Sequence, residues 1–317
     1  MNLPRFLLGR LVSVLGTILG VSVLLFVGSN LAPGSTAAAV LGPGAGSDQV
    51  REFNHNAGLD RPWLTQYLSW LGRAARGDLG QSWVQEQPVL TVIRGSLGST
   101  LLLVLLAGVL TVVGSLLVGV YAGLRPGGRA DTVLSVTAVT AVSIPQFVLA
   151  ALSVLVFASW LHWLPAVSLV GFGETPLDKP SVLVMPVAVL AAFGIAWASR
   201  LIRAVVVDAN ASPHVEASRL AGLPERTVVF RHLLPVTTGP VAQTLAWLVG
   251  TLVGGTAVVE RVFAYPGLSQ PLIDAVHRHD TPVVEGVGLL LAAVILVALV
   301  LADVVGLIAD PRVGTAR

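Results

Sequence analysis

Three side chains near residue 280 are of the types that coordinate transition metals. His277 and His279 lie two residues apart, and Asp280 follows directly. Imidazole nitrogens and carboxylate oxygens are common ligands of divalent transition-metal ions. The pattern offers no further ligand in a fixed position. We therefore interpret this segment as a solvated loop and predict no metal site.

Two carboxylates, Glu260 and Asp303, lie at or just inside the ends of apolar segments. An acidic side chain at membrane depth is a candidate for a proton relay, which would make the chain a proton-coupled secondary transporter. The alternative is a structural role, in which the acid caps a helix or forms an ion pair, for example Asp303 or Asp310 with Arg312. We favour the structural role.

Sequence motifs for catalysis are absent from the chain. It contains no P-loop pattern, no Gly-x-Ser-x-Gly and no His-Glu-x-x-His. It also has no cysteine, which excludes disulfides, thiolate catalysis and cysteine-ligated metal. We therefore predict that the chain is not an enzyme and has no ATPase site of its own.

The composition is that of a membrane protein. Of 317 residues, 54% are hydrophobic and 11% are charged, whereas a soluble domain carries about 25% charge. The mean hydropathy is +0.83 and the pI is about 9.5. Lys179 is the only lysine, and the arginines lie mostly at the ends of apolar segments. This placement favours membrane topology over nucleic-acid binding.

A helix needs about 20 apolar residues to cross a bilayer, and six segments meet this requirement. They are residues 9–30, 97–123, 132–161, 182–202, 240–260 and 284–308. The apolar run of the first, residues 11–27, exceeds the roughly 7–15 residues of a signal-peptide core, so we predict an uncleaved anchor. A cleaved signal peptide stays open as the alternative because small residues follow at 37–39.

Arginines predict the orientation of these spans. They precede span one and follow spans two, four and six, which places both termini in the cytoplasm by the positive-inside tendency. The residues are Arg5, Arg10, Arg125, Arg129, Arg203, Arg219, Arg226, Arg231, Arg312 and Arg317. The loop at 32–96 also carries arginines, but loops of this length cross regardless of charge. Inside it, residues 62–76 place Leu64, Tyr67, Leu68 and Leu71 on one face of a predicted amphipathic helix.

Span three is the most polar of the six. Thr132, Thr140, Ser143 and Gln146 fall within about 120° of one helical face, and Pro145 should kink the helix. Polar groups at membrane depth usually face protein or water. We predict that Thr140, Ser143 and Gln146 line a translocation path. Hydrogen bonds from Thr and Ser to their own helix backbone are the alternative.

Span five adds two further candidates for this path, Gln243 and Thr251. Gly250 and Gly254 of the same span are four residues apart, a spacing that lets helices approach closely. The partner could be the same helix of another subunit.

A short helix is predicted at residues 212–222, between spans four and five. Ser212 can cap its N-terminus, Pro213 suits the first position, and Gly222 followed by Pro224 ends it, with Gly222 at positive φ. A helix of this length is unstable alone in water, so it needs a surface to pack against. It is either a docking element or a helix lying at the membrane interface.

The residues of this segment resemble the coupling motif of the permease subunits of ABC importers. Glu216, Ala217, Gly222, Leu234 and Pro235 match in register, while Ser218 replaces an Ala and His232 an Ile. Residues 57–71, 76–83, 143–147, 259–268 and 310–312 also resemble permeases of dipeptide, oligopeptide and nickel importers. The resemblance covers nearly the whole chain.

The resemblance implies an all-α membrane protein with the type I importer permease fold. It comprises span one (1–31), an extracytoplasmic loop (32–96), a core (97–309) containing coupling helix 212–222, and a cytoplasmic tail (310–317). The coupling residues are Glu216, Ala217, Ser218, Gly222, Leu234 and Pro235.

Several partners are also implied by the resemblance, all in the bacterial inner membrane or next to it. They are a second homologous permease, forming a heterodimer, two cytoplasmic ATPase subunits that use ATP and Mg, and an extracytoplasmic solute-binding protein. Nucleic acid is not expected. Di- or oligopeptides are the expected substrates, with nickel or another small solute as the alternative.

Overall fold

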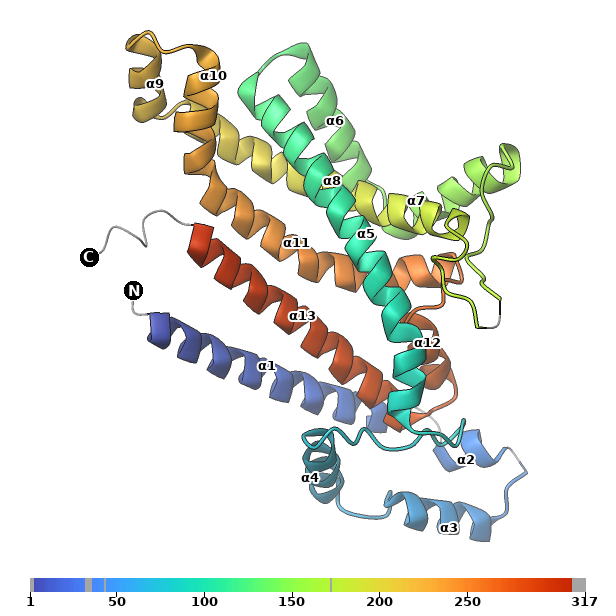
Figure 1. Ribbon diagram of the computed structural model, residues 1–317. Coiled ribbons are helices and arrows are strands. Elements are labelled where there is room, and N and C mark those ends of the chain that lie inside the picture. Colours follow the sequence, from blue (N-terminus) through green and yellow to red (C-terminus); the bar gives the residue numbers. More distant parts are fainter. Residues whose placement is uncertain (1–2, 32–35, 43, 172, 310–317) are drawn as a thin grey trace. The chain divides into compact units, whose positions relative to one another are not determined.

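The computed structural model describes residues 3–31, 36–42, 44–171 and 173–309. Within them, the regular elements are helical apart from one isolated bridge between Gln81 and Pro88. The elements in chain order (Figure 1) are α1 (Leu3–Leu31), α2 (Thr36–Leu41), α3 (Ser47–Ala57), α4 (Trp63–Ala74), α5 (Val89–Leu124), α6 (Arg129–Ser143), α7 (Gln146–Ser153), the π-helix η1 (Val154–Trp160), α8 (Ser181–Asn210), α9 (Pro213–Leu220), α10 (Glu225–Thr227), the π-helix η2 (Val228–Leu233), α11 (Leu234–Val262), α12 (Ser269–His277) and α13 (Thr281–Ala309).

The described residues form two compact units. The first unit contains the chain up to residue 100 together with residues 266–294, and the second contains residues 101–265 and the chain from residue 295. Helices α5 and α13 each contribute to both units. The tail predicted at 310–317, and with it Asp310 and Arg312, lies outside the described residues.

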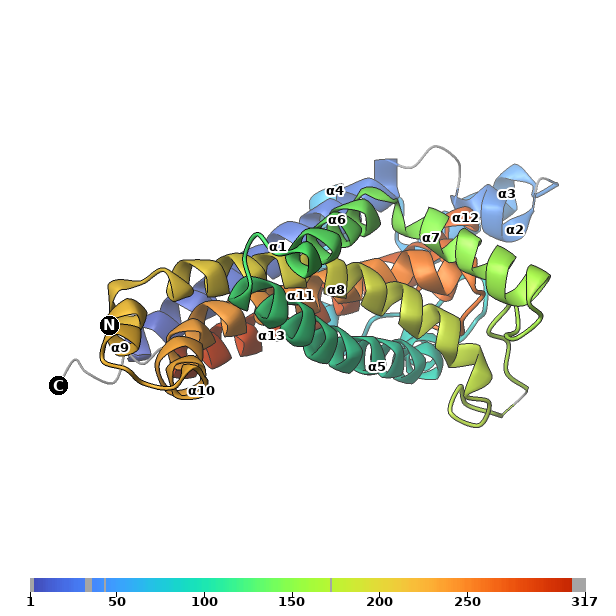
Figure 2. The ribbon, with the colours of Figure 1, turned by 90° about the horizontal axis from the view of Figure 1, so that it is seen from above.

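Helix α8 is the centre of the second unit. It packs against α11, α6 and α7, and it contributes many of the buried side chains of the unit (Figures 1 and 2). Glycines bring α5 close to it. A Cβ on Gly119 would lie 2.7 Å from the carbonyl oxygen of Ser199, and one on Gly123 would lie 2.6 Å from Cβ of Val206. Side chains at these two glycines would separate α5 from α8.

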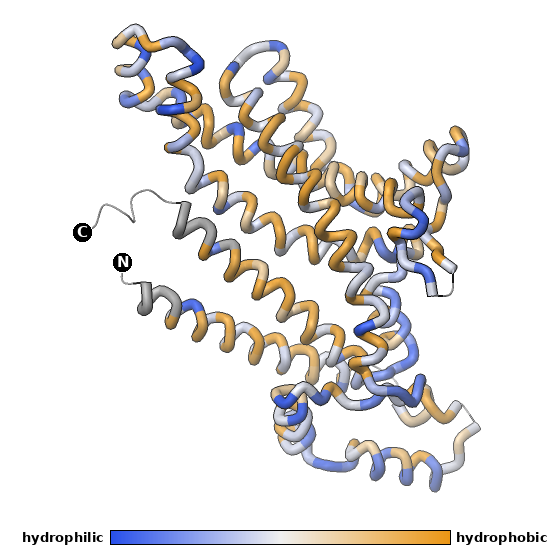
Figure 3. Tube along the Cα trace, viewed as in Figure 1, coloured by the Kyte–Doolittle hydropathy of each residue, from blue (hydrophilic) through white to orange (hydrophobic). Residues whose placement is uncertain are grey.

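Five long apolar helices match the predicted spans one, two, four, five and six. They cover Leu8–Leu31, Val89–Leu124, Ser181–Asn210, Glu225–Val262 and Thr281–Leu301. Apolar residues dominate along them in Figure 3, and polar residues gather in the connecting segments. The long apolar stretches are therefore visible in both the sequence and the structure.

Span three differs from the prediction. Instead of one kinked helix over 132–161, α6 ends at Ser143, α7 begins at Gln146, and the two are bent by 99°. Ile144 and Pro145 are extended, with ψ angles of 123° and 138°. Proline disfavours the helical conformation in the residue before it and cannot donate to the preceding turn, so the helix breaks here.

The amphipathic helix predicted at 62–76 is α4, and Trp70 is its most buried residue. Trp70 is 5% exposed, whereas Leu64 and Leu68 are 69% and 56% exposed. The Tyr67 hydroxyl lies 2.8 Å from the Ser22 hydroxyl of α1, and its ring meets Phe26 edge-on. Tyr67 therefore joins α4 to α1, while Leu64 and Leu68 stay exposed.

Candidate functional site

The loop between α8 and α11 contains the predicted short helix. Helix α9 begins at Pro213, directly after the extended Ser212, whose carbonyl accepts from the N–H groups of Val215 and Glu216 at 3.1 Å. The Ser212 side chain itself makes no capping bond. Gly222 ends the helix with φ of +77°, as predicted. A Cβ there would meet no atom within 4 Å, so a side chain would cost backbone strain alone, about 1 kcal/mol.

Arg219 fastens α9 to both neighbouring elements. Its Nη2 donates to the Asn210 side chain at 2.6 Å and to Glu225 Oε1 at 2.8 Å, and Nε donates to Glu225 Oε2 at 3.2 Å. The Glu225 carboxylate raises the pKa of Arg219 further above its ordinary value. In the sequence, Arg219 indicates membrane topology alone. This clamp was missed because the three residues lie on three different elements.

The inner side of α9 packs into a small apolar core. Val215 is fully buried against a cluster that includes Val228, Leu233, Ile202 and Val206. Ser218 is also buried, and its hydroxyl donates to the carbonyl of His214 at 2.9 Å. The chain itself therefore supplies the surface on which this short helix is stable.

The outer side of the loop carries exposed apolar groups. Leu220 is 83% exposed and Phe230 is 69% exposed, and Glu216 and Ala217 are exposed beside them. Leu234 packs with the same core as Val215, and Pro235 is exposed in the first turn of α11. Glu216, Ala217, Ser218 and Gly222 thus lie in the loop that follows α8 (Figure 1), whereas Leu234 and Pro235 are the first two residues of α11.

The residues predicted to line a path do not share one helical face. Thr140 and Ser143 are exposed on α6, and the Ser143 hydroxyl donates to the carbonyl of Val139 at 2.8 Å. Gln146 lies beyond the 99° bend and lies against α11, since a Cβ on Gly255 would be 3.2 Å from Gln146 Oε1. The Gln146 Nε2 is buried and has no hydrogen-bond partner in the described part of the chain. The predicted single arc was wrong because it assumed a continuous helix.

Gln243 and Thr251 are both exposed on α11, and the Thr251 hydroxyl donates to its own helix at the Leu248 carbonyl, at 2.8 Å. The two glycines predicted for helix packing differ from each other. A Cβ on Gly250 would lie 3.4 Å from Leu299 of α13, whereas one on Gly254 would meet no atom within 4 Å. Gly254 is thus the one of the two that faces open space in this chain.

The two acidic residues singled out from the sequence differ in burial. Glu260 is fully buried in α11, and its carbonyl accepts from the N–H of Tyr265 at 2.9 Å. Burial, together with the nearby Glu260 charge, raises the pKa of Tyr265. Asp303 is half-buried in α13, and its predicted partner Arg312 lies outside the described residues.

The His-Arg-His-Asp segment is not simply a solvated loop. Asp280 is 2% exposed and accepts from the Ser82 hydroxyl and from the N–H of Trp83, the latter at 3.0 Å. It therefore holds segment 82–83 to the start of α13. No group of three or more His, Cys, Asp or Glu side chains that could hold a metal occurs in the described part of the chain.

Two known protein families match the sequence of this chain. Residues 115–315 match the family described as binding-protein-dependent transport system inner membrane component. Residues 3–104 match the corresponding N-terminal family of such membrane components. The chain belongs to this family. It is therefore an integral inner-membrane component of a binding-protein-dependent transport system, an importer permease of the ABC class.

Curated relatives match over almost their whole length. A protein of Brucella abortus strain 2308, named as a peptide transport system permease protein, is 33% identical over 98% of this chain and 99% of its own. The oligopeptide transport system permease protein AppB of Bacillus subtilis is 29% identical over 98% of this chain and 99% of its own. The glutathione transport system permease protein GsiC of Escherichia coli is 30% identical over 98% of each chain.

Among solved structures, the fold is similar to a chain of the methionine ABC transporter MetNI in inward-facing conformations. The TM-score is 0.52 at 18% sequence identity, over 70% of this chain and 97% of that chain. At this identity the similarity concerns the fold alone. It agrees with the predicted all-α importer permease fold, and this chain has the bent pair of helices in place of the one kinked span that was predicted.

Proposed function

We propose that this chain is a permease subunit of an ATP-driven importer of di- or oligopeptides, and that the α9 loop is where ATPase subunits dock. The names of the relatives, which include peptide, oligopeptide and glutathione permeases, support the substrate class. The observation that carries the docking role is the exposed Leu220 on a clamped, internally packed helix. An exposed leucine on a rigid support suits burial by a partner.

The partners follow from this role. Two cytoplasmic ATPase subunits bind ATP and Mg and supply the energy, so the chain itself needs no ATPase site. A second homologous permease completes the path, and an extracytoplasmic solute-binding protein delivers the peptide. The N- and C-termini and the α9 loop lie in the cytoplasm, which agrees with the arginines that flank the spans.

The translocation path in this proposal runs past α6, α7 and α11. The exposed Thr140 and Ser143 contribute from α6, and Gln243 and Thr251 contribute from α11. Gln146 contributes from the bend, with its amide against α11. Open space beside Gly254 gives α11 of a second permease subunit room to approach.

The docking role is tested by Leu220→Asp in the complete transporter, reconstituted in liposomes with its ATPase and binding-protein subunits. A carboxylate at a buried apolar contact should lower the affinity for the ATPase subunits by about tenfold or more. Peptide import should fall in parallel, while membrane insertion should stay normal. Affinity is measured by titrating purified ATPase subunits onto the permease.

The matched control is Leu177→Asp. Leu177 is also an exposed leucine of the second unit, at 59%, but it lies in the segment between η1 and α8. This variant should bind ATPase and import peptide like the wild type. Wild-type ATPase binding by the Leu220→Asp variant would show that the α9 loop is a passive linker.

A further inference from the structure

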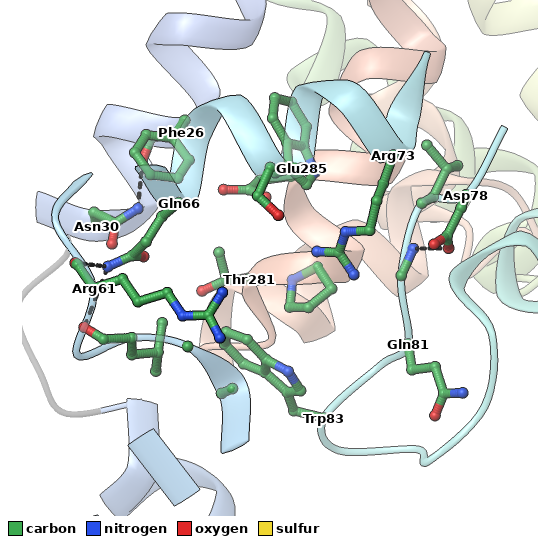
Figure 4. Close-up of a pocket in the computed structure, with 18 of the residues that line it drawn as sticks. Phe26, Asn30, Arg61, Gln66, Arg73, Asp78, Gln81, Trp83, Thr281 and Glu285 are labelled. Carbon is green, nitrogen blue, oxygen red and sulfur yellow. Dashed lines mark hydrogen bonds between the residues drawn. The ribbon is translucent and has the colours of Figure 1, made fainter. Parts of the chain in front are cut away.

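A pocket of about 510 Å³ lies within the first unit, and neither the coupling loop nor the proposed path uses it. Its wall is formed by the end of α1, the turn before α4, α4 itself, residues 78–83 and the start of α13 (Figure 4). Small-molecule sites in proteins have volumes of about 300–1,000 Å³. The pocket is therefore large enough for a compound of several hundred daltons.

Two arginines reach into this pocket from opposite sides. Figure 4 shows the guanidinium groups of Arg61 and Arg73 extending toward the same space. Neither side chain forms an ion pair or a hydrogen bond with any residue that the structure describes. A guanidinium group presents a planar fork of donors that matches a carboxylate. The pair therefore offers two guanidinium groups to an anionic group, and the charge of Arg73 also acts on Glu285 in the same pocket.

The position of Arg61 is fixed by its neighbours. The side-chain amide of Gln66, one turn into α4, donates to the carbonyl of Arg61 at 2.8 Å and to that of Leu59 at 3.2 Å. Both bonds hold the turn between α3 and α4 against α4. The arginine thus extends from a fastened backbone, which lowers the entropy lost when it binds a ligand.

Two buried polar groups complete the pocket. Glu285 of α13 is 4% exposed, and its Oε1 accepts from the Ser29 hydroxyl at 3.1 Å. Among the described residues its Oε2 has no hydrogen-bond partner. Trp70 is 5% exposed and lines the pocket, and its indole nitrogen is buried without a hydrogen-bond partner among the described residues. Trp70 therefore contributes the surface of its ring to the wall of the pocket.

We propose that this pocket binds a short peptide with free termini, an inference that rests on the peptide substrate proposed above. Arg61 and Arg73 bind the terminal carboxylate, Glu285 binds the terminal ammonium group, and the Trp70 ring packs against the peptide. Asp78 also lines the pocket, but its Oδ1 already accepts from the N–H of Gly80 at 2.9 Å. In the proposed orientation the site faces the side from which import begins.

Thiol protection tests this proposal directly because the native chain has no cysteine. A single cysteine replaces Gln81, an exposed residue that lines the pocket, in the complete transporter in nanodiscs without nucleotide or binding protein. Tri-alanine should slow its modification by a water-soluble thiol reagent. Tri-alanine with an acetylated N-terminus and an amidated C-terminus should not. A cysteine at Gln85, which is exposed and does not line the pocket, is the control and should not be protected.

Arginine variants in the Gln81→Cys background test the carboxylate site. Arg73→Ala should raise the tri-alanine concentration needed for protection by about tenfold or more, because a charge-assisted pair is lost. Arg76→Ala is the matched control. Arg76 is exposed and three residues away, and it does not line the pocket. Arg76→Ala should leave the protection curve unchanged.

The outcomes separate this proposal from the proposed function. Tri-alanine that leaves Gln81→Cys unprotected, or equal protection by the blocked peptide, overturns the peptide site even if the wild-type complex imports peptides. If the solute-binding protein protects the cysteine of the Gln81→Cys variant and tri-alanine does not, the peptide site is overturned as well. The pocket is then a docking surface for that protein. A wild-type complex that imports no peptide overturns the proposed function, whatever the protection result.

Discussion

Polar side chains along the proposed path differ in how their hydrogen bonds are satisfied. The Ser143 hydroxyl donates to its own helix at Val139, so the residue can face water or protein without penalty. The Gln146 amide nitrogen is buried without a hydrogen-bond partner among the residues that the structure describes, which costs about 1–3 kcal/mol in a protein interior. Among the described path residues, Gln146 therefore has the most to gain from an acceptor on a substrate or a second subunit.

A cysteine at Ser143 tests whether this face of α6 contacts water. We expect Ser143→Cys to react with a membrane-impermeant thiol reagent in at least one nucleotide state of the assembled transporter, because the residue is exposed in the chain. Labelling is measured by a mass shift on gels. Ala138→Cys, at a position on the same helix that is 7% exposed, should stay unreactive. A Ser143→Cys protein that never reacts would place this face against lipid or another helix.

At the residue scale, local signals were predictable and distant pairings were not. Gly222 at positive φ follows from a Gly-Leu-Pro sequence that directly follows a short helix. Arg219 bonds to residues nine positions before and six positions after it, and no periodic pattern marks that clamp. The unpaired arginines of the pocket depend on how α3, α4 and α13 fold together, which a linear pattern does not contain.

Helices α6 and α8 are joined by an ion pair that the sequence analysis missed. Arg203 donates to both carboxylate oxygens of Asp131, through Nε to Oδ1 and through Nη2 to Oδ2 at 2.7 Å. Asp131 is 3% exposed and also accepts from the N–H of Gly127 at 2.9 Å. The pair therefore fixes the turn between α5 and α6 to the helix that leads into the α9 loop.

Removing the cation should destabilise the chain because the buried carboxylate loses its partner. We expect Arg203→Ala to cost about 2–3 kcal/mol, less than for a fully buried pair because the Arg203 side chain is 32% exposed. The midpoint of thermal unfolding in detergent, followed by size-exclusion chromatography, measures this loss. Arg200→Ala should change the midpoint little, since Arg200 is exposed on the same helix.

The double variant Asp131→Asn with Arg203→Gln separates charge from packing. It should be more stable than Arg203→Ala, because no unpaired charge stays buried. A double variant as unstable as Arg203→Ala would show that the contribution of Arg203 comes from side-chain packing instead.

At the element scale, the five unbroken spans were predictable from length and apolar content alone, since a bilayer sets the required length. For the break after Ser143, the sequence predicted a kink but not the size of the bend. Proline indicated a kink, but a 99° bend needs neighbours that hold α7 in its new direction, and these are α8 and α11. Periodicity across such a break carries no information about which residues share a face.

The number of spans decides on which side of the membrane the α9 loop lies. If the bent pair α6–α7–η1 crosses the membrane, six crossings place the N-terminus, the α9 loop and the C-terminus on the same side. If the pair enters the membrane and returns to the same side, only five helices cross. The α9 loop then lies on the side of the membrane opposite to the N-terminus. Only the first arrangement lets cytoplasmic ATPase subunits reach α9 while the arginine-rich N-terminus stays inside.

Single cysteines on either side of α8 distinguish these arrangements. In intact spheroplasts, Lys179→Cys should react with an impermeant maleimide, because the segment between η1 and α8 lies outside if the bent pair crosses. Arg226→Cys should react only after the membrane is permeabilised. Both native residues are exposed, so accessibility within the chain does not limit either reaction. Labelling of Arg226→Cys from outside would show that the bent pair does not cross, and it would remove the docking proposal together with the cytoplasmic placement of α9.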